Sequence, residues 1–148
     1  MASLAENRKA RFDFEMLESY EAGIELLGLE VKSIKAHRMT LEGSYVFPRR
    51  GEFWLVGANV APYQPNNTPK DYNPMRERKL LLSKKEISYL LGKVAQRGLT
   101  ILPVRVYNKS SIIKLEIAVA RRLKKHDKRE RIKEREDARK IERTLKEL

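Results

Sequence analysis

The sequence predicts a mainly β fold, a small antiparallel barrel that carries two to three peripheral helices and a basic C-terminal tail. In several short segments apolar and polar residues alternate with a period of two, which is typical of half-buried strands. Only a few helical patterns lie between these segments, too few for a parallel α/β sheet. The last 28 residues contain many charges and few apolar side chains, so they cannot bury themselves in the same core.

The N-terminal half contains two expected hairpins. Residues 12–16 and 20–26 both alternate between apolar and polar side chains, so we expect them to pair. Gly23, inside the second segment, suggests a bulge or a close approach of neighbouring chain. Residues 44–47 and 52–56 flank a short loop that contains glycine, and they predict the second hairpin.

Two helices are expected in the body. Residues 30–36 combine apolar side chains with lysines, which predicts a short helix with a basic face. Ser83 and Glu86 form a capping box, in which each side chain can bond to the backbone amide of the other. Apolar residues recur at helical spacing over 87–94, and Gly98 ends the pattern.

The remaining body segments complete the barrel. Residues 62–74 contain four of the six prolines and predict a long surface loop. Residues 100–107 and 112–119 are rich in β-branched side chains and predict a third hairpin. Six short strands with a helix inserted between hairpins fit an OB-like, partly Greek-key antiparallel barrel.

The charge of the chain is concentrated at its C-terminal end. The protein has 32 Lys/Arg and 20 Asp/Glu, and residues 121–148 contribute 13 and 7 of these, half of the net charge of +12. We therefore divide the chain into a barrel, 1–120, and a tail, 121–148, that is disordered when free and becomes helical on a polyanion. Acid-first pairs at i,i+4 spacing favour that helix: Asp127–Arg131, Glu136–Lys140 and Glu142–Lys146.

Composition excludes several classes of function. The absence of cysteine excludes disulfides, cysteine zinc sites and thiol catalysis, and no metal-ligand spacing or phosphate-binding glycine motif indicates a cofactor. No apolar run could span a membrane and no signal peptide is present, so we expect a cytoplasmic protein. His37 and His126 could serve a ribonuclease, but nothing in the sequence places them together. We therefore expect no enzymatic activity.

Three carboxylates are notable in so basic a chain. Glu21, Glu25 and Glu30 could form local salt bridges with Lys32 or Lys35. Alternatively, they could accept hydrogen bonds from RNA base edges or ribose hydroxyls.

Two interpretations are possible for the charged residues 76–79, and two for the tyrosines. Residues 76–79 are either a solvated charge run or a patch that grips RNA phosphates. The six tyrosines could stack on bases, although most are expected to pack in the core or across hairpins.

Six short motifs together resemble the SmpB family of SsrA-binding proteins. They occur in the family's order over residues 7–135, and they read Asn7-Arg8-Lys9-Ala10-Arg11, Glu21-Ala22-Gly23, Glu30-Val31-Lys32-Ser33, Ser44-Tyr45-Val46, Arg78-Lys79-Leu80-Leu81-Leu82 and Asp127-Lys128-Arg129. The resemblance implies an OB-like protein that binds the tRNA-like domain of transfer-messenger RNA and delivers it to stalled ribosomes for trans-translation. It also implies that the tail enters the vacant mRNA channel beside the small-subunit decoding centre and becomes helical there.

The resemblance also implies which residues act. The residues expected on the RNA-binding face of the body are Asn7, Glu21, Leu81 and Lys114, and those expected near the decoding centre are His126, Asp127, Lys128 and Arg129. One departure from the family is Arg122, which replaces a glycine at the junction of barrel and tail. It implies a stiffer hinge, or a last strand that runs straight into a helix. The alternative function is a ribosomal or ribosome-assembly protein that binds rRNA, and in either case we expect a monomer when free.

Overall fold

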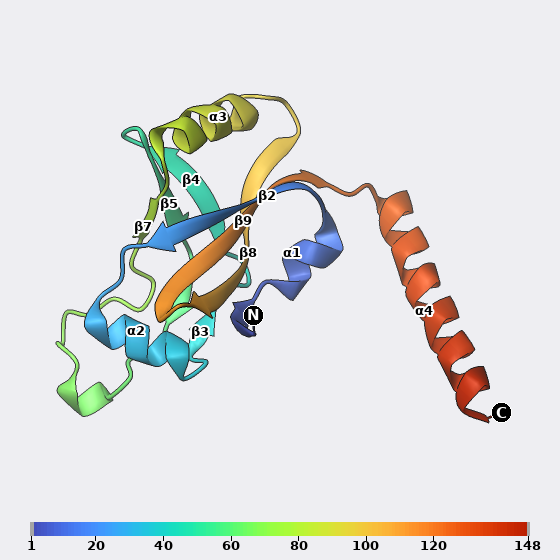
Figure 1. Cartoon of the computed structure of the whole chain (residues 1–148), viewed down its shortest axis with the longest axis horizontal. Coiled ribbons are helices and arrows are strands. Elements are labelled where there is room, and N and C mark those ends of the chain that lie inside the picture. Colours follow the sequence, from blue (N-terminus) through green and yellow to red (C-terminus); the bar gives the residue numbers. More distant parts are fainter. Residues whose placement is uncertain (1, 148) are drawn as a thin grey trace.

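The computed structural model describes residues 2–147 and is mainly β (Figure 1). Its elements in chain order are β1 (Ser3–Glu6), α1 (Arg8–Asp13), β2 (Phe14–Ile24), α2 (Gly28–Lys35), β3 (Met39–Thr40), β4 (Tyr45–Arg49), β5 (Glu52–Val56), β6 (Asn59–Val60), the 3-10 turn η1 (Pro65–Asn67), β7 (Arg78–Leu81), α3 (Lys84–Val94), β8 (Leu99–Lys109), β9 (Ile112–Arg122) and α4 (Lys125–Glu147).

Seven strands form one antiparallel sheet in the order β1-β8-β9-β2-β7-β5-β4, and β3 pairs with β6 in a second, small sheet. The sheet curls until β4 lies near β8, but no strand pair joins these two strands. The predicted mainly β fold is confirmed, whereas the closed barrel of six strands is not observed. Pro48 lies within β4, and a proline has no backbone N–H to offer to a further strand, so it suits an open edge.

The N-terminal hairpin predicted for residues 12–16 and 20–26 is wrong. Residues 14–24 form the single strand β2, which pairs with β9 along its length, and the break in alternation is a shift of register between Met16 and Glu18. A bulge of this kind inserts a residue without ending the strand. Phe12 and Asp13 belong instead to the short helix α1.

The helices and the two other hairpins predicted for the body are confirmed. The helix expected at residues 30–36 is α2, and the hairpins are β4–β5 and β8–β9. The capping box begins α3: the amide of Glu86 donates to Ser83 Oγ at 3.2 Å, and the amide of Ser83 donates to Glu86 Oε1 at 3.0 Å. These features are encoded by neighbouring residues, which explains why they can be read from the sequence.

The core lies inside the curl of the sheet. Phe53, Leu80 and Leu115 are among the fully buried side chains of the strands. Ile34 of α2 and Leu90 of α3 join the same cluster, and these two helices cover opposite ends of the sheet (Figure 1). The strands therefore bury one face and leave the other free for contacts.

The last strand leads almost directly into the tail helix. β9 continues through Arg122, so the expected boundary at 120/121 falls within it, and α4 begins at Lys125 after two residues. The backbone N–H of Leu123 donates to the carbonyl of Asp13 at 2.9 Å, and the leucine side chain is buried. The guanidinium of Arg122 lies 5.7 Å from the ring centroid of Phe14. The junction is therefore packed against the start of β2, and α4 projects from it (Figure 1).

Within residues 2–147, no helix is both long enough and apolar enough to cross a membrane.

Candidate nucleic-acid interface

Three of the four residues expected on the RNA-binding face of the body lie on one face of the large sheet. Gly23 of β2 pairs with Leu81 of β7 on one side and with Lys114 of β9 on the other, so these residues form a row across three strands. Glu21 is two residues before Gly23 and therefore points to the same face. Leu81 is 53% exposed. Together, Glu21, Leu81 and Lys114 offer a partner a carboxylate, an apolar contact and a cation.

The carboxylate of Glu21 is held in place by two neighbours from β8. The hydroxyl of Tyr107 donates to one oxygen, and the ammonium of Lys109 lies 3.2 Å from both. The hydrogen bond from Tyr107, followed by that from Lys109, keeps the pKa of Glu21 below its ordinary value. Burial and the same hydrogen bond raise the pKa of Tyr107 to about 12. Glu21 is therefore ionised at neutral pH, and its exposed lone pairs can accept further hydrogen bonds.

Gly23 allows Leu81 to lie close to the sheet. A Cβ atom built on Gly23 would be 3.1 Å from the Cβ of Leu81, closer than side-chain carbons normally approach. The close approach predicted at this glycine is confirmed. The bulge in β2 lies elsewhere, near Met16.

Lys114 places a cation on the same face of the sheet as Glu21 and Leu81. Within residues 2–147 its ammonium forms no hydrogen bond or ion pair, although its charge helps to lower the pKa of Glu21. An unpaired lysine at the edge of an apolar contact is suited to a phosphate oxygen.

Asn7 lies apart from this row and has a structural task. Its side chain is buried, its Oδ1 accepts from the amide of Ala10 at 3.2 Å, and its Nδ2 donates to the carbonyl of Pro103 at 2.9 Å. Asn7 thus caps α1 and ties that helix to β8. Direct RNA contact by Asn7 stays a prediction.

The four residues expected near the decoding centre begin α4. His126 and Arg129 are exposed, and His126 Nε2 lies 3.1 Å from a carboxylate oxygen of Glu130. Asp127 accepts weakly from the amide of Lys124 at 3.4 Å, as a residue in the first turn of a helix can. Lys128 turns toward the body. The ribosomal role of this turn, and its disorder in the free protein, stay predictions.

The three i,i+4 ion pairs predicted within the tail are not formed. Arg131 instead donates to the carbonyls of Arg11 at 2.8 Å and Phe14 at 3.3 Å, and neither Glu136–Lys140 nor Glu142–Lys146 approaches within ion-pair distance. Exposed pairs of this kind contribute little, so solvent and a nearby carbonyl compete well for the same side chains.

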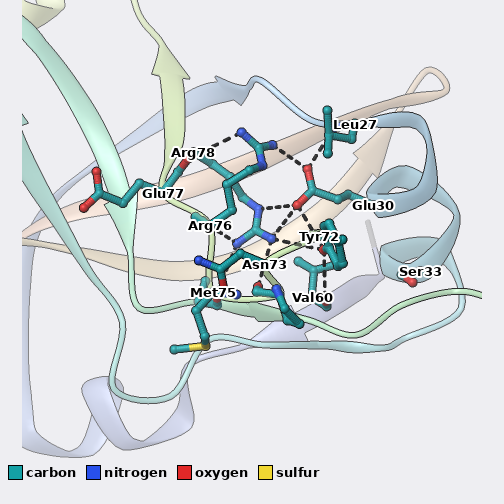
Figure 2. A network of polar contacts seen from close by, with 12 residues as sticks. Leu27, Glu30, Ser33, Val60, Tyr72, Asn73, Met75, Arg76, Glu77 and Arg78 are labelled. Atoms are coloured by element: carbon teal, nitrogen blue, oxygen red, sulfur yellow. Dashed lines mark hydrogen bonds and ion pairs between the residues drawn. The ribbon is translucent and has the colours of Figure 1, made fainter. Parts of the chain in front are cut away.

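The two arginines of the run at residues 76–79 bind a buried carboxylate rather than solvent. Arg78 and Glu30 are both fully buried, and Arg78 Nε donates to Glu30 at 2.9 Å (Figure 2). Arg76 Nη2 donates to the other carboxylate oxygen at 2.5 Å. Burial raises the pKa of Glu30, but hydrogen bonds from Arg76, the amide of Leu27 and Arg78 outweigh it and hold the pKa below its ordinary value. Neither reading of this run was correct for Arg78, which is neither solvated nor free for phosphate.

The same network fixes the proline-rich loop. The hydroxyl of Tyr72 lies 3.2 Å from Glu30 and donates to the carbonyl of Val60 at 2.8 Å (Figure 2). Arg78 also donates to the carbonyls of Ala58 and Pro74, each at 3.0 Å. Lys32 and Lys35, the partners considered for Glu30 from the sequence, are exposed, and the ion pairs of Glu30 are formed with Arg76 and Arg78 instead. The sequence contains no local sign of this network, because Glu30 is more than 40 residues away from Tyr72, Arg76 and Arg78.

The structure brings no catalytic cluster together in the part of the chain that it describes. His37 is the second residue after α2 and His126 lies in the first turn of α4, and these helices lie on opposite sides of the molecule (Figure 1). No group of three or more His, Asp or Glu side chains among residues 2–147 is arranged to hold a metal ion.

Known proteins resemble the chain along almost all of its length. The model of the family described as "SmpB protein" matches residues 4–147. The SsrA-binding proteins of Thermosynechococcus vestitus and Gloeothece citriformis are 46% and 48% identical to it over 97% of the chain, which covers 94% and 92% of their lengths. A solved chain described as "tmRNA-SmpB: a journey to the center of the bacterial ribosome" superposes with a TM-score of 0.67 at 44% identity, covering 81% of this chain and 84% of that one.

Fold and surface define a small basic β-sheet protein with a charged helical extension, a combination typical of RNA-binding proteins. The match over residues 4–147 makes the assignment specific. The chain belongs to the SmpB family.

Proposed function

We propose that this protein is an RNA-binding adaptor of trans-translation. It binds the tRNA-like domain of transfer-messenger RNA and delivers it to stalled ribosomes, and it makes and breaks no covalent bond. The observation that carries the proposal is the identity of 46–48% with SsrA-binding proteins over 97% of the chain. The superposition on a solved tmRNA-SmpB chain supports the same partners, transfer-messenger RNA and the ribosome.

The sheet face around Gly23 is the proposed RNA-binding surface of the body. Glu21 accepts hydrogen bonds from base edges or ribose hydroxyls, Leu81 contacts an apolar face of a base or ribose, and Lys114 contacts a phosphate. Asn7 contributes by holding α1 against β8. The support is geometric, because three of the four residues share one face of adjacent strands.

The first turn of α4 is the proposed reader of the empty mRNA channel. His126 and Arg129 are exposed there, and an imidazole ring can stack on a base while a guanidinium binds phosphate. The rest of the helix supplies charge without sequence preference.

Recovery of RNA with the tagged protein from cells tests the partner. We expect transfer-messenger RNA to be enriched over tRNA and rRNA. Stable recovery of one small-subunit rRNA without transfer-messenger RNA would instead indicate a ribosomal or assembly protein.

Truncation tests the division of labour between body and tail. The structure favours a stop after Lys124, because β9 and the buried Leu123 then stay intact. We expect the truncated protein to lose less than about tenfold in affinity for the tRNA-like domain at moderate salt, yet to support no peptide tagging on stalled ribosomes. A complete loss of RNA binding by a folded truncated protein would contradict the division.

Single substitutions test the sheet face. Lys114→Gln should lower the affinity for the tRNA-like domain about fivefold, because one phosphate contact is lost. Lys85→Gln, on the exposed surface of α3, removes the same charge and serves as the matched control. Equal losses in both variants would show that only net charge matters.

A further inference from the structure

The tail helix is docked on the body over its first three turns. Lys128 Nζ lies 2.9 Å from a carboxylate oxygen of Asp13, and both side chains are at least three-quarters buried. One turn on, Arg131 donates to carbonyls of Arg11 and Phe14. One turn further, the guanidinium of Arg135 lies 5.6 Å from the ring centroid of Phe12. These contacts fix the orientation of α4 relative to α1.

The docked side of α4 continues as a basic stripe. At about 100° per residue, the seven cations of this stripe fall within one third of the helix circumference. They are Lys125, Lys128, Arg131, Arg135, Arg139, Arg143 and Lys146, and Glu142 is the one carboxylate among them. Carboxylates of Glu130, Glu134 and Asp137 lie on the opposite side. The charge of α4 is therefore segregated, with its positive side toward α1.

A groove of about 550 Å³ separates the two helices at this point. Arg8, Lys9 and Arg11 line it from α1, and Arg135 lines it from α4. Phe12 forms part of its wall, and the carboxylates of Glu6 and Glu42 also line it. Cations thus outnumber carboxylates, and within residues 2–147 neither Lys9, Arg11 nor Arg135 forms an ion pair with a carboxylate.

We propose that this groove between α1 and α4 is a second RNA site, which binds the phosphodiester backbone of one RNA strand. Arginines that converge from two walls suit a ligand with repeated phosphates, because each guanidinium can bond to two oxygens. The site rests on the proposed function, since its ligand is a strand of the same RNA that the body binds. Bound phosphates would bridge α1 and α4 and so hold the tail at a defined angle to the body.

The shape of the site favours RNA over a membrane. The groove is concave, and a flat bilayer cannot enter it. Within residues 2–147, the exposed large apolar side chains of α4 are Ile132, Ile141 and Leu145. At about 100° per residue, Ile132 falls within the basic stripe and the other two fall on the opposite side, so α4 lacks the continuous apolar face that a membrane-binding helix presents opposite its cations.

Substitution of Asp13 distinguishes RNA binding in this groove from non-specific electrostatic attraction between the basic protein and RNA. Asp13→Asn makes the protein more positive, so general attraction predicts tighter RNA binding. The proposed site predicts the opposite, because α4 loses its anchor and the groove loses one wall. We expect the full-length variant to bind the tRNA-like domain about fivefold more weakly, the effect of ~1 kcal/mol of docking energy. Asp137→Asn, on the acidic side of α4, makes the same charge change and should bind equally or more tightly.

A double swap checks that the ion pair is the cause. Asp13→Lys with Lys128→Asp keeps the net charge and restores a pair of opposite charges, and it should bind within about twofold of wild type. Tighter binding by Asp13→Asn, or a swapped variant as weak as Asp13→Asn, would overturn the proposal. Thermal unfolding of each variant shows whether the body remains folded.

The salt dependence of RNA binding measures how many phosphates the protein neutralises. Arg8→Gln with Arg135→Gln should lower the slope of log affinity against log salt concentration by about two. Lys133→Gln with Lys140→Gln, outside the stripe, should change it less. Equal changes, or displacement of the RNA by polyglutamate at matched charge concentration, would overturn the site.

An unrelated hairpin RNA is measured in parallel with each variant. If wild-type protein does not prefer the tRNA-like domain to this hairpin, the proposed function fails. The comparison of Asp13→Asn with Asp137→Asn on the hairpin would still decide whether the groove binds RNA backbone.

Discussion

The guanidinium groups of this protein lie in two opposite environments. In the body, that of Arg78 is buried and paired, whereas in the outer part of the tail helix, within residues 2–147, they are exposed and unpaired. Arg78 is fully buried and donates to Glu30 and to the carbonyls of Ala58, Arg76 and Pro74. The arginines of α4 beyond Arg135 are exposed, and they have no carboxylate partner within the described residues. The comparison teaches that net charge alone does not locate a binding surface. A cation that is buried and paired stabilises the fold, and only an unpaired one is free for RNA.

Removal of the buried carboxylate should have the largest effect. Glu30→Ala leaves Arg78 buried without its counter-ion and should lower the free energy of unfolding by about 3–5 kcal/mol. Denaturant unfolding of the full chain measures this loss. Glu134→Ala on α4 is the matched control, and it should change the free energy by less than about 0.5 kcal/mol. Similar losses of unfolding free energy in both variants would show that the buried carboxylate of the body is no more important for stability than an exposed one of the tail.

Acid should weaken the same interaction. Because the pKa of Glu30 in the folded protein is below its ordinary value of 4.5, its stabilising effect is complete above that pH and is lost as the pH falls through the folded pKa. The difference in unfolding free energy between wild type and Glu30→Gln should therefore be constant near neutral pH and shrink below about pH 4.5. Carboxylates common to both proteins cancel in this difference. A difference that grows in acid would show that the sign of the pKa shift is wrong.

Substitution of Gly23 tests the sheet face, whose side chains are neither fully buried like Arg78 nor fully exposed like the outer part of the tail. Gly23→Ala brings a Cβ to 3.1 Å from Leu81, so Leu81 must shift. We expect a loss of about 1 kcal/mol in unfolding free energy and a weaker affinity for the tRNA-like domain. Gly92→Ala in α3 meets no atom within 4 Å and should instead stabilise the protein by up to about 1 kcal/mol. Unchanged RNA binding by Gly23→Ala would argue against Leu81 as a contact.

The smallest effect is expected for a single cation of the tail. Arg139→Gln should change the free energy of unfolding by less than about 0.5 kcal/mol, because the side chain is exposed. It should lower the salt slope of RNA binding by at most about one. A clear loss of stability would reveal a folding role for the outer half of α4.

The features that the sequence predicted correctly are those set by neighbouring residues. The capping box at Ser83 and the alternation in the two later hairpins determine local structure, so α3, β4–β5 and β8–β9 were predictable. The bulge near Met16 broke the alternation of β2 and imitated the turn of a hairpin.

The features that were missed depend on residues far apart in the chain. Glu30 lies 46 residues from Arg76 and 48 from Arg78, and nothing in their spacing predicts that the sheet brings them together. The docking of Arg131 on α1 is likewise set by the packed junction at Leu123. For the candidate site, the resemblance supplied Glu21, Leu81 and Lys114, and only the register of three strands shows that they share a face.

The bonds that Tyr72 makes to Glu30 and Val60 have a consequence for recognition. Fixing one free residue costs about 1–2 kcal/mol of conformational entropy. In the proline-rich loop, Tyr72 is already fixed in the free protein, so a partner that binds there does not have to order it. A molecule that contacts the loop meets a rigid surface, so its association should be fast and should require little rearrangement of the protein.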